Sequence, residues 1–447
     1  NPGSFEYKII EVNPRVSRSS ALASKATGYP IAKVATKIAM GYHLDEIRND
    51  VTGKTMSSYE PALDYCAVKI PKWPFDKLQS ESRQLGTMMM ATGEVMAIGN
   101  RFESALLKGL RSLENGCDGF ALPKAAALSL PALEEKVKEG SDERIFYLAE
   151  LLKRGADIKR CAELSLFDPW FVHKIQNIVR WEEELNGKKL GELTSEELRF
   201  LKQRGFSDVT LARCLGDTEP SVRNRRKALG VLPVYKMVDT CAGEFDAVSN
   251  YFYSTYDIED EAAPSSREKV AVIGSGPIRI GQGVEFDYCS VHGVLALREM
   301  GYEAILINNN PETVSTDFDI SDRLYFEPIT DEDVLNIIDK EKPLGVILQF
   351  GGQTAIKLAD AFQKNRVRIL GTSMEGIDAA ENREIFDGIL ADCGIRRPAG
   401  AAAMEIEEGI AAADKLGYPV LVRPSYVIGG LGMEIAWNRT ELENWLR

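Results

Sequence analysis

The sequence predicts an α/β protein with an all-helical region in its middle. Residues 1–114 mix strand-like and helix-like segments, whereas residues 115–264 read as one helix after another. From residue 269 a strand, a glycine-rich turn, a helix at 286–300 and a second strand at 303–309 follow in regular alternation. Such alternation is typical of a parallel, Rossmann-like sheet that binds ligands at the carboxyl ends of its strands. Because a chain of 447 residues is too long for one hydrophobic core, several domains are expected.

The first α/β region is predicted from four segments. Residues 5–12 and 63–70 form apolar, strand-like runs. Residues 30–40 place apolar side chains at helical spacing and are followed by Gly41, a residue type common at helix C-termini. A further helix is expected at 104–115, because its leucines recur three and four residues apart.

The middle region is predicted to be helical because its apolar residues recur with the helical period. The expected helices include 133–138, 143–154, 169–184, 195–204 and 219–229. Residues 257–266 are acidic and then small and polar, which is typical of a linker.

The second α/β region begins with a strand at 269–273 and carries further local signals. Thr330 with Asp333 predicts a capped helix that runs to Lys340. A strand at 345–350 precedes a second glycine turn, and another α/β unit starts near residue 389.

Composition and charge exclude several classes of protein. The formal net charge of −13 disfavours a general binder of nucleic acid or of anionic membranes. No apolar run approaches the roughly 20 residues needed to span a bilayer, and no signal peptide is recognisable at the start. The seven cysteines form no CxxC pair and there are only three histidines, so a zinc site is not expected. We therefore expect a cytoplasmic protein with reduced thiols and with no nucleic-acid or membrane partner.

The two ends predict that the chain is an internal piece of a longer protein. Residue 1 is Asn rather than Met, and a strand-like run begins almost at once. The chain stops at Arg447, inside a segment that reads as a helix from Thr440. Natural domains seldom begin and end in this way.

A candidate metal site lies in the segment Ile9-Ile-Glu-Val-Asn-Pro-Arg15. Because alternate residues of a strand share a face, Glu11 and Asn13 are expected to point the same way. Two oxygen donors suit Mg²⁺, which completes its shell with phosphate and water. Arg15 follows where it could bind phosphate oxygens. The spacing alone favours this interpretation no more than an ordinary solvated strand end.

A candidate nucleotide site lies in residues 421–432. An apolar strand brings Arg423 to its end, and a loop with Gly429 and Gly430 follows. Glycines let backbone N–H groups approach a phosphate closely, and the arginine adds a fixed positive charge. A flexible hairpin loop is the alternative, but the arginine at the strand end favours nucleotide binding.

Two other motifs receive structural interpretations. The turn at 274–283 is not a GxGxxG fingerprint and lacks an acidic residue at the ribose-binding distance. A tight turn at a topological switch point is therefore favoured, and an anionic substrate touching Arg279 is the alternative. Residues 207–227 have helix-turn-helix texture, but the acidic chain favours helical packing with a solvated basic face over DNA binding.

Six longer passages are specific enough to indicate a family. They are Glu11-Val-Asn-Pro-Arg-Val-Ser-Arg-Ser-Ser-Ala-Leu-Ala-Ser-Lys-Ala-Thr-Gly28, Thr92-Gly-Glu-Val-Met-Ala-Ile-Gly99, Lys236-Met-Val-Asp-Thr-Cys-Ala-Gly-Glu-Phe245, Gly281-Gln-Gly-Val-Glu-Phe-Asp-Tyr288, Asn310-Pro-Glu-Thr-Val-Ser-Thr-Asp317 and Gly351-Gly-Gln-Thr354. With these passages the chain resembles the large chain of carbamoyl-phosphate synthase along essentially its whole length.

The resemblance implies two synthetase halves separated by a helical oligomerisation domain. Each half is an ATP-grasp unit preceded by a Rossmann-like pre-ATP-grasp domain. In this scheme residues 1–114 correspond to the end of the first ATP-grasp unit and residues 115–264 to the helical domain. Residues 267–388 correspond to the second pre-ATP-grasp domain, and residues 389–447 to the start of the second ATP-grasp unit. The chain would then hold parts of two active sites and be inactive alone.

The resemblance also implies a ligase reaction and its partners. One half activates bicarbonate with ATP as carboxyphosphate, which ammonia converts to carbamate, and the other half phosphorylates carbamate. The product, carbamoyl phosphate, feeds pyrimidine and arginine biosynthesis. Implied cofactors are ATP and Mg²⁺ or Mn²⁺, with K⁺ as a further candidate. Implied partners are a glutaminase small subunit that supplies ammonia and a second copy bound through the helical domain.

Site residues of the first half are carried over by matching motifs. Glu11 and Asn13 match metal ligands, and Glu11 lies beside the nucleotide that the metal bridges. Arg15 matches the phosphate-facing arginine next to them and is the expected catalytic residue.

Site residues of the second half are carried over in the same way. Arg423, Gly429 and Gly430 match the strand-end arginine and glycine loop of the nucleotide site. Arg383 matches an earlier arginine that contacts the nucleotide, and Asn382 stands where the family more often has Asp.

Two other classes of protein are alternatives to this family. A biotin-dependent carboxylase is also an ATP-grasp ligase, but it would not place a helical domain between two synthetase segments. A non-catalytic assembly module, or a DNA-binding protein built on the helical region, is the alternative from another class.

Overall fold

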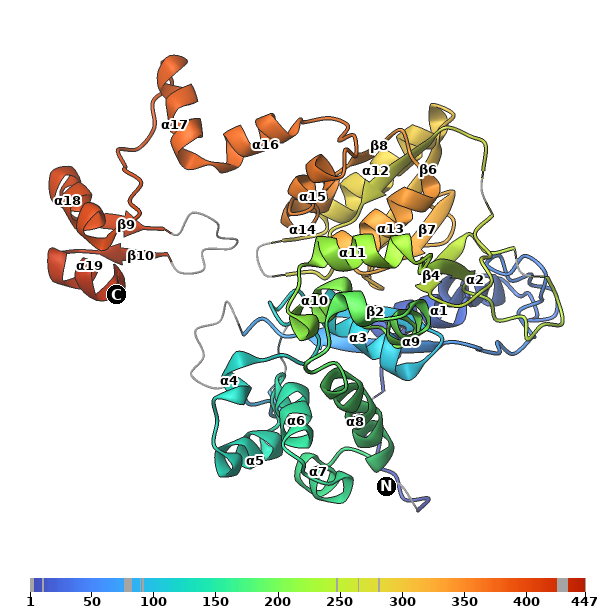
Figure 1. Cartoon of the computed structure of the whole chain (residues 1–447). Coiled ribbons are helices and arrows are strands. Elements are labelled where there is room, and N and C mark those ends of the chain that lie inside the picture. The colour runs from blue at the N-terminus through green and yellow to red at the C-terminus, as the bar shows by residue number, and fades with distance from the viewer. Residues whose placement is uncertain are drawn as a thin grey trace.

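The structure is a computed structural model of the whole chain. It describes residues 4–9, 12–75, 83–88, 90, 92–246, 248–263, 265–279, 282–423 and 433–446. In Figure 1 most of the chain forms one body, and the C-terminal segment, drawn in red, lies apart from it.

The body is built around a six-stranded sheet with the strand order β3-β4-β7-β6-β5-β8. The strands are β3 (Val234–Met237), β4 (Tyr251–Thr255), β5 (Lys269–Ile273), β6 (Glu303–Asn308), β7 (Arg323–Phe326) and β8 (Gly345–Ile347). β3 pairs antiparallel with β4, and all other neighbours run parallel. β5 lies between β6 and β8, so the predicted parallel sheet and the switch point at the end of β5 are confirmed.

Helices cover this sheet as the alternating pattern predicts. They are α12 (Glu285–Glu299), α13 (Asp331–Glu341), α14 (Gly352–Ile356) and α15 (Ala359–Lys364), with a short 3-10 turn, η2 (Gln349–Gly351), before α14. The Asp333 amide donates to Thr330 Oγ1 over 3.2 Å, which confirms the predicted cap of α13.

The middle of the chain is helical. It contains α4 (Pro123–Ala126), α5 (Leu130–Lys138), α6 (Arg144–Lys153), α7 (Ile158–Ser165), α8 (Pro169–Glu183), the 3-10 turn η1 (Leu190–Glu192), α9 (Ser195–Gln203), α10 (Asp208–Leu215) and α11 (Glu219–Ala228). These helices share one hydrophobic core with α3 (Phe102–Ser112), to which Leu106, Leu133 and Leu198 belong. Burial of these periodic apolar faces is what stabilises the short helices.

The helical region ends before residue 264, the boundary expected from the sequence. β3 and β4 fall within the range 115–264 but belong to the six-stranded sheet. Tyr251, Phe252 and Tyr253 are buried there, and aromatic residues pack well on a pleated surface. The predicted linker is also fastened to this edge, since Glu261 accepts hydrogen bonds from the Met237 amide and Lys236 Nζ, both over 2.7 Å.

The first α/β region contributes helices and a small sheet. Its elements are α1 (Arg18–Thr27), α2 (Ile31–Ala39), β1 (Cys66–Lys72) and β2 (Gly93–Gly99). β1 and β2 pair antiparallel, and buried residues of β2 extend the cores on both sides.

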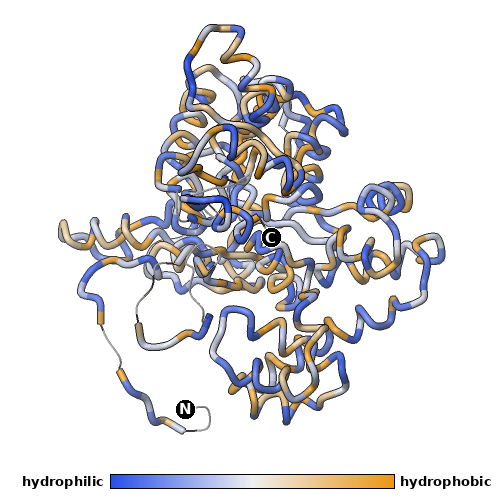
Figure 2. The backbone as a smooth tube through the Cα atoms, turned by 90° about the vertical axis from the view of Figure 1, so that its left-hand side faces the viewer, coloured by the Kyte–Doolittle hydropathy of each residue, from blue (hydrophilic) through white to orange (hydrophobic). Residues whose placement is uncertain are grey.

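The strand predicted at residues 5–12 is not formed in the part of it that the structure describes. Residues 4–9 and 12 have no strand assignment, and the Phe5 and Tyr7 side chains are exposed. In Figures 1 and 2 this N-terminal segment extends away from the body. An apolar run becomes a strand only when another strand pairs with its backbone groups, and none of the described strands pairs with these residues.

The C-terminal segment forms a small unit of its own. It comprises α17 (Arg383–Asp392), α18 (Ile406–Leu416), β9 (Val420–Val422), β10 (Glu434–Ala436) and α19 (Arg439–Leu446). The preceding helix, α16 (Met374–Glu381), still packs on the body, because its Ile377 belongs to the core of the six-stranded sheet. β9 and β10 pair antiparallel, and Ala413, Ala436 and Leu442 form a small core.

The helix-turn-helix texture at 207–227 is α10 and α11, and two basic residues of α11 face inward. Arg226, with no exposed surface, pairs with Asp208 over 2.8 Å, and Arg223 pairs with Asp339 of α13 over 2.6 Å. Helical packing is therefore confirmed. Lys227 is exposed as expected, but Arg223 and Arg226 are buried, because carboxylates of α10 and α13 neutralise them.

Candidate functional site

The first predicted site lies in the N-terminal segment that precedes α1. Asn13 and Arg15 are both exposed there, and Arg15 Nη1 donates to the neighbouring Val16 carbonyl over 3.3 Å. Glu11 lies outside the described residues. Whether Glu11 and Asn13 share a face therefore stays a prediction.

The second predicted site lies in the C-terminal unit. Arg423 directly follows β9 and is exposed, whereas Gly429 and Gly430 lie outside the described residues. Arg383 is the first residue of α17 and is exposed as well.

Asn382, the departure from the family pattern, caps this helix. Its Oδ1 accepts hydrogen bonds from the amides of Glu384 and Ile385 over 3.0 and 3.3 Å. Because Asn caps a helix as well as Asp does, the substitution leaves the placement of Arg383 intact.

The two sets of predicted residues lie in different parts of the structure. Figure 1 places the N-terminal segment at the lower end of the body, and it places the unit with α17 and β9 to the left of the body. That the two sets belong to two different sites stays a prediction.

A third group of charged residues gathers at the carboxyl edge of the parallel sheet, where ligands of such sheets bind. We call Arg18, Lys25, Lys69, Glu94 and Glu312 the sheet-edge cluster. Arg18 Nε lies 3.0 Å from Glu312 Oε1, and Lys69 Nζ lies 2.7 Å from Glu94 Oε1. The cluster thus joins α1, β1 and β2 to the loop after β6.

Two buried carboxylate oxygens of the sheet-edge cluster have no hydrogen-bond partner among the described residues. They are Glu94 Oε2 and Glu312 Oε2. Burial raises the pKa of Glu312, and Glu94 adds to this effect while Arg18 opposes it. The two carboxylates can therefore accept hydrogen bonds from a ligand or from water.

Lys25 anchors α1 to the loop that contains residues 310–317. Its Nζ donates to the Thr313 carbonyl and to Thr316 Oγ1, the latter over 2.6 Å, and lies 3.3 Å from Asp317. Burial lowers the pKa of Lys25, although Asp317 acts in the opposite direction.

The sheet-edge cluster was not predicted from the sequence. Apart from Lys69, its residues stand in passages that carry the family resemblance, at 11–28, 92–99 and 310–317. The presence of charged residues in these passages was the only hint of this site in the sequence. The spacing of the residues could not show that their side chains are buried.

The glycine-rich turn after β5 is a tight turn that hydrogen bonds to β6 hold in place. The Gly274 amide donates to the Ile307 carbonyl over 2.8 Å, and the Gly276 amide donates to Asn308 Oδ1 over 3.0 Å. Gly276 has a φ of +65°, which favours glycine. Arg279 pairs with Glu114 and donates to Thr354 Oγ1 over 3.1 Å, so its charge is already balanced within the chain. These contacts support the structural interpretation of the turn.

The described residues offer neither a cluster of metal ligands nor a membrane-spanning helix. No group of three or more His, Cys, Asp or Glu side chains in the described ranges could hold a metal ion. None of the described helices is both long enough and apolar enough to cross a membrane.

Three family models match the chain. Residues 1–47 and 382–447 match the carbamoyl-phosphate synthase L chain, ATP binding domain. Residues 94–230 match the carbamoyl-phosphate synthetase large chain, oligomerisation domain, and residues 266–379 match the carbamoyl phosphate synthase preATP-grasp domain.

Relatives with the same name extend the match to the whole chain. The carbamoyl phosphate synthase large chains of Clostridium botulinum (strain Loch Maree) and Clostridium perfringens (strain 13) are each 58% identical over 446 residues. Each alignment covers 100% of this chain and 42% of the relative, so the chain spans about two fifths of the length of the relatives it matches. Among solved structures, a biotin carboxylase–beta-gamma-ATP complex from Campylobacter jejuni covers 40% of each chain at 16% identity, with a TM-score of 0.31.

Proposed function

Because the chain belongs to the family of carbamoyl phosphate synthase large chains, we propose that it forms part of an ATP-dependent ligase that makes carbamoyl phosphate. The observation that carries this proposal is the identity of 58% along the whole chain, across four consecutive matched segments. The proposed substrates are ATP, bicarbonate and ammonia, with carboxyphosphate and carbamate as intermediates.

The exposed arginines of the two candidate sites are proposed to bind phosphate. Phosphoryl transfer depends on positioning and on neutralising the charge of the phosphate oxygens. Arg15 would do this in the first site, and Arg383 and Arg423 in the second. Their exposure supports the proposal, because an exposed guanidinium can bind a phosphate ligand.

A divalent cation is proposed for the first site. Asn13 offers an exposed amide oxygen, the donor type that Mg²⁺ and Mn²⁺ accept, and Glu11 would supply a carboxylate. When bound, such an ion neutralises phosphate oxygens. K⁺ is a further candidate for which no donor set is assigned.

Partners and location follow from the same proposal. A glutaminase small subunit would supply ammonia, and a second copy would bind through the helical region, which matches an oligomerisation domain. The product would feed pyrimidine and arginine biosynthesis in the cytoplasm.

The activity can be tested in a chimera. We would replace the corresponding two fifths of the Clostridium perfringens large chain with these 447 residues. The chimera should hydrolyse ATP in a bicarbonate-dependent manner and should make ATP from carbamoyl phosphate and ADP. A folded chimera that catalyses neither of these two partial reactions would rule out the proposed function.

Self-association can be tested on the chain itself. Sedimentation over a range of protein concentrations should show a dimer or larger species. A single monomeric species at every concentration would contradict the proposed role of the helical region.

A further inference from the structure

Lys25 is a buried lysine to which neither candidate site gives a role. Only 7% of its side chain is exposed, and a lysine is almost never buried unless it is paired. Its Nζ donates to the Thr313 carbonyl and to Thr316 Oγ1, the latter over 2.6 Å, and lies 3.3 Å from Asp317 Oδ1. One loop thus supplies an oxygen partner for each of the three N–H donors of the ammonium group.

The loop that holds this lysine, residues 310–317 after β6, is itself fixed to the six-stranded sheet. Asn310 has no exposed surface and donates from Nδ2 to the carbonyl of Gly276, in the turn after β5, over 3.0 Å. The Asn310 carbonyl accepts hydrogen bonds from Thr313 Oγ1 and Thr316 Oγ1, both over 2.9 Å. Because these bonds do not involve the lysine, the loop should keep its shape when the lysine is replaced.

Lys25 lies in the last turn of α1, the helix that directly follows the first candidate site. Asn13 and Arg15 stand within five positions of Arg18, the first residue of this helix. Arg18 makes a second contact with the same loop, since its Nε lies 3.0 Å from Glu312 Oε1, but 60% of its side chain is exposed. An exposed ion pair contributes little, so the buried lysine is the stronger anchor of α1.

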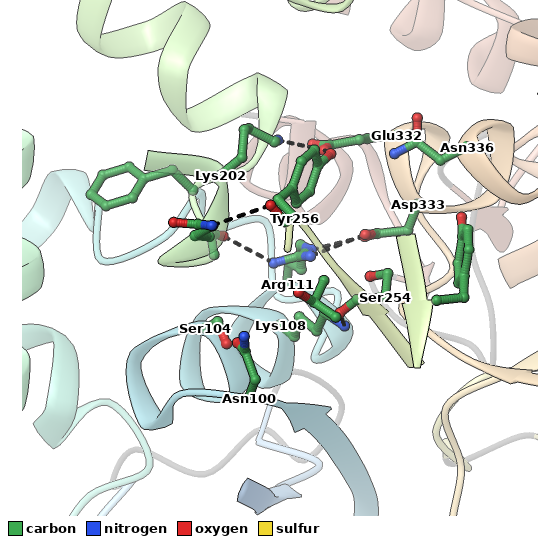
Figure 3. Close-up of a pocket in the computed structure, with 15 residues that line it drawn as sticks. Asn100, Ser104, Lys108, Arg111, Lys202, Ser254, Tyr256, Glu332, Asp333 and Asn336 are labelled. Carbon is green, nitrogen blue, oxygen red and sulfur yellow. Dashed lines mark hydrogen bonds and ion pairs between the residues drawn. The ribbon is translucent and has the colours of Figure 1, made fainter. Parts of the chain in front are cut away.

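A separate contact keeps the first α/β region on the sheet without Lys25. In the close-up of Figure 3, Arg111 of α3 faces Asp333 of α13, and the two side chains pair over 2.8 Å. Lys108 of the same helix pairs with Glu327 over 2.7 Å. Loss of Lys25 should therefore release α1 locally and leave the body assembled.

We propose that Lys25 is a positioning residue of the first candidate site: by fixing α1 to the loop after β6, it holds Asn13 and Arg15 where they bind metal and phosphate. This role rests on the proposed function. It makes a loop of the second α/β region responsible for the orientation of residues in the first site. Phosphoryl transfer depends on such positioning, and a displacement of about 1 Å can slow a reaction about a hundredfold.

The chimera with the Clostridium perfringens large chain separates positioning from folding. Bicarbonate-dependent ATP hydrolysis reports on the first half, and ATP synthesis from carbamoyl phosphate and ADP reports on the second. Lys25→Met should lower the kcat of the hydrolysis about ten- to a hundredfold and leave the KM for ATP almost unchanged, because a displaced Arg15 stabilises the transition state less. ATP synthesis should be unaffected, because the loop after β6 keeps its own hydrogen bonds.

The matched control is Lys33→Met in α2. Lys33 pairs with Asp319 over 2.6 Å, but 45% of each side chain is exposed, so both reactions should stay unchanged. Unchanged hydrolysis in Lys25→Met, equal losses in both reactions, or a change confined to the KM would each overturn the proposal. If the unsubstituted chimera catalyses neither reaction, the proposed function itself fails.

Hydrogen exchange in the 447-residue chain tests the anchor independently of activity. Amides of α1 should exchange about tenfold faster in Lys25→Met than in the unsubstituted chain, and those of α12 and α13 should exchange at the same rate. Equal protection of α1 in both chains would show that Lys25 does not anchor the helix. Faster exchange throughout the variant would show that Lys25 supports the whole fold rather than the first site, and either result would overturn the proposal.

Discussion

Lys108 of α3 and Glu327, which follows β7, form an ion pair of 2.7 Å although 219 positions separate them in the sequence. Their side chains are 5% and 0% exposed. Lys108 Nζ also donates to the carbonyls of Ile98 and Ser254 over 3.1 and 2.8 Å. Burial lowers the pKa of Lys108, and Glu327 opposes this effect. The pair therefore ties the first α/β region to the six-stranded sheet.

Removing one partner of this pair should be strongly destabilising. Lys108→Met would leave the Glu327 carboxylate buried without its cation, which costs roughly 3–5 kcal/mol. Chemical denaturation should show this loss in the free energy of unfolding. The matched control is Lys364→Met, because Lys364 and Asp360 form an exposed pair with 71% and 60% of the side chains accessible. That substitution should cost no more than about 0.5 kcal/mol, and similar losses in both variants would refute the assignment.

Stability should depend on the ionisation of Glu219 at the start of α11. Burial raises the pKa of this side chain to about 7, and the neighbouring carboxylates Asp331 and Glu332 add to the effect. The folded pKa lies above the ordinary value of 4.5, so the folded chain binds the proton more tightly than the unfolded chain. The stabilisation is complete below pH 4.5 and is lost as the pH rises through 7.

The variant Glu219→Gln isolates this effect. At pH 5 its denaturation midpoint should match that of the unsubstituted chain, and at pH 8 the variant should be the more stable. A constant difference between the two proteins across this range would show that Glu219 does not titrate as argued.

Gly93 at the start of β2 should not tolerate a side chain. A Cβ at this position would collide with the carbonyl oxygen of Ile278 in the glycine-rich turn. Gly93→Ala should therefore lower the denaturation midpoint, because the turn or β2 must move. Gly388 of α17 is the matched control, since a Cβ there meets nothing within 4 Å. Gly388→Ala should stabilise its helix by about 0.5–1 kcal/mol; destabilisation by both substitutions would contradict the steric argument.

Arg423 should matter for the second nucleotide site. In the chimera, Arg423→Ala should reduce ATP synthesis from carbamoyl phosphate and ADP about ten- to a hundredfold, because a charge-assisted contact to phosphate is worth roughly 1.5–3 kcal/mol. Arg439→Ala is the control: Arg439 is in the same unit but pairs with Asp414 and Glu443. Equal losses would indicate damage to the unit rather than a lost phosphate contact.

Local patterns in the sequence determined much of the second α/β region and the helical region. The strand at 269–273 and the cap at Thr330 depend on neighbouring residues, and the structure has both where the sequence predicts them. The helical spacing of leucines likewise located α3 to within a few residues. These features can be predicted from the sequence because the interactions that specify them span only one turn of helix or one strand.

The tertiary structure alone decided which segments meet. The apolar run at 5–12 reads like a strand, but its described residues form no strand, whereas β3 and β4 leave the helical region to join the sheet. The side chains of Lys25 and Glu312 look like ordinary polar groups until α1 and the loop after β6 bury them. Burial, partners and pKa shifts depend on contacts between distant parts of the chain, and periodicity within a short window carries no information about those contacts.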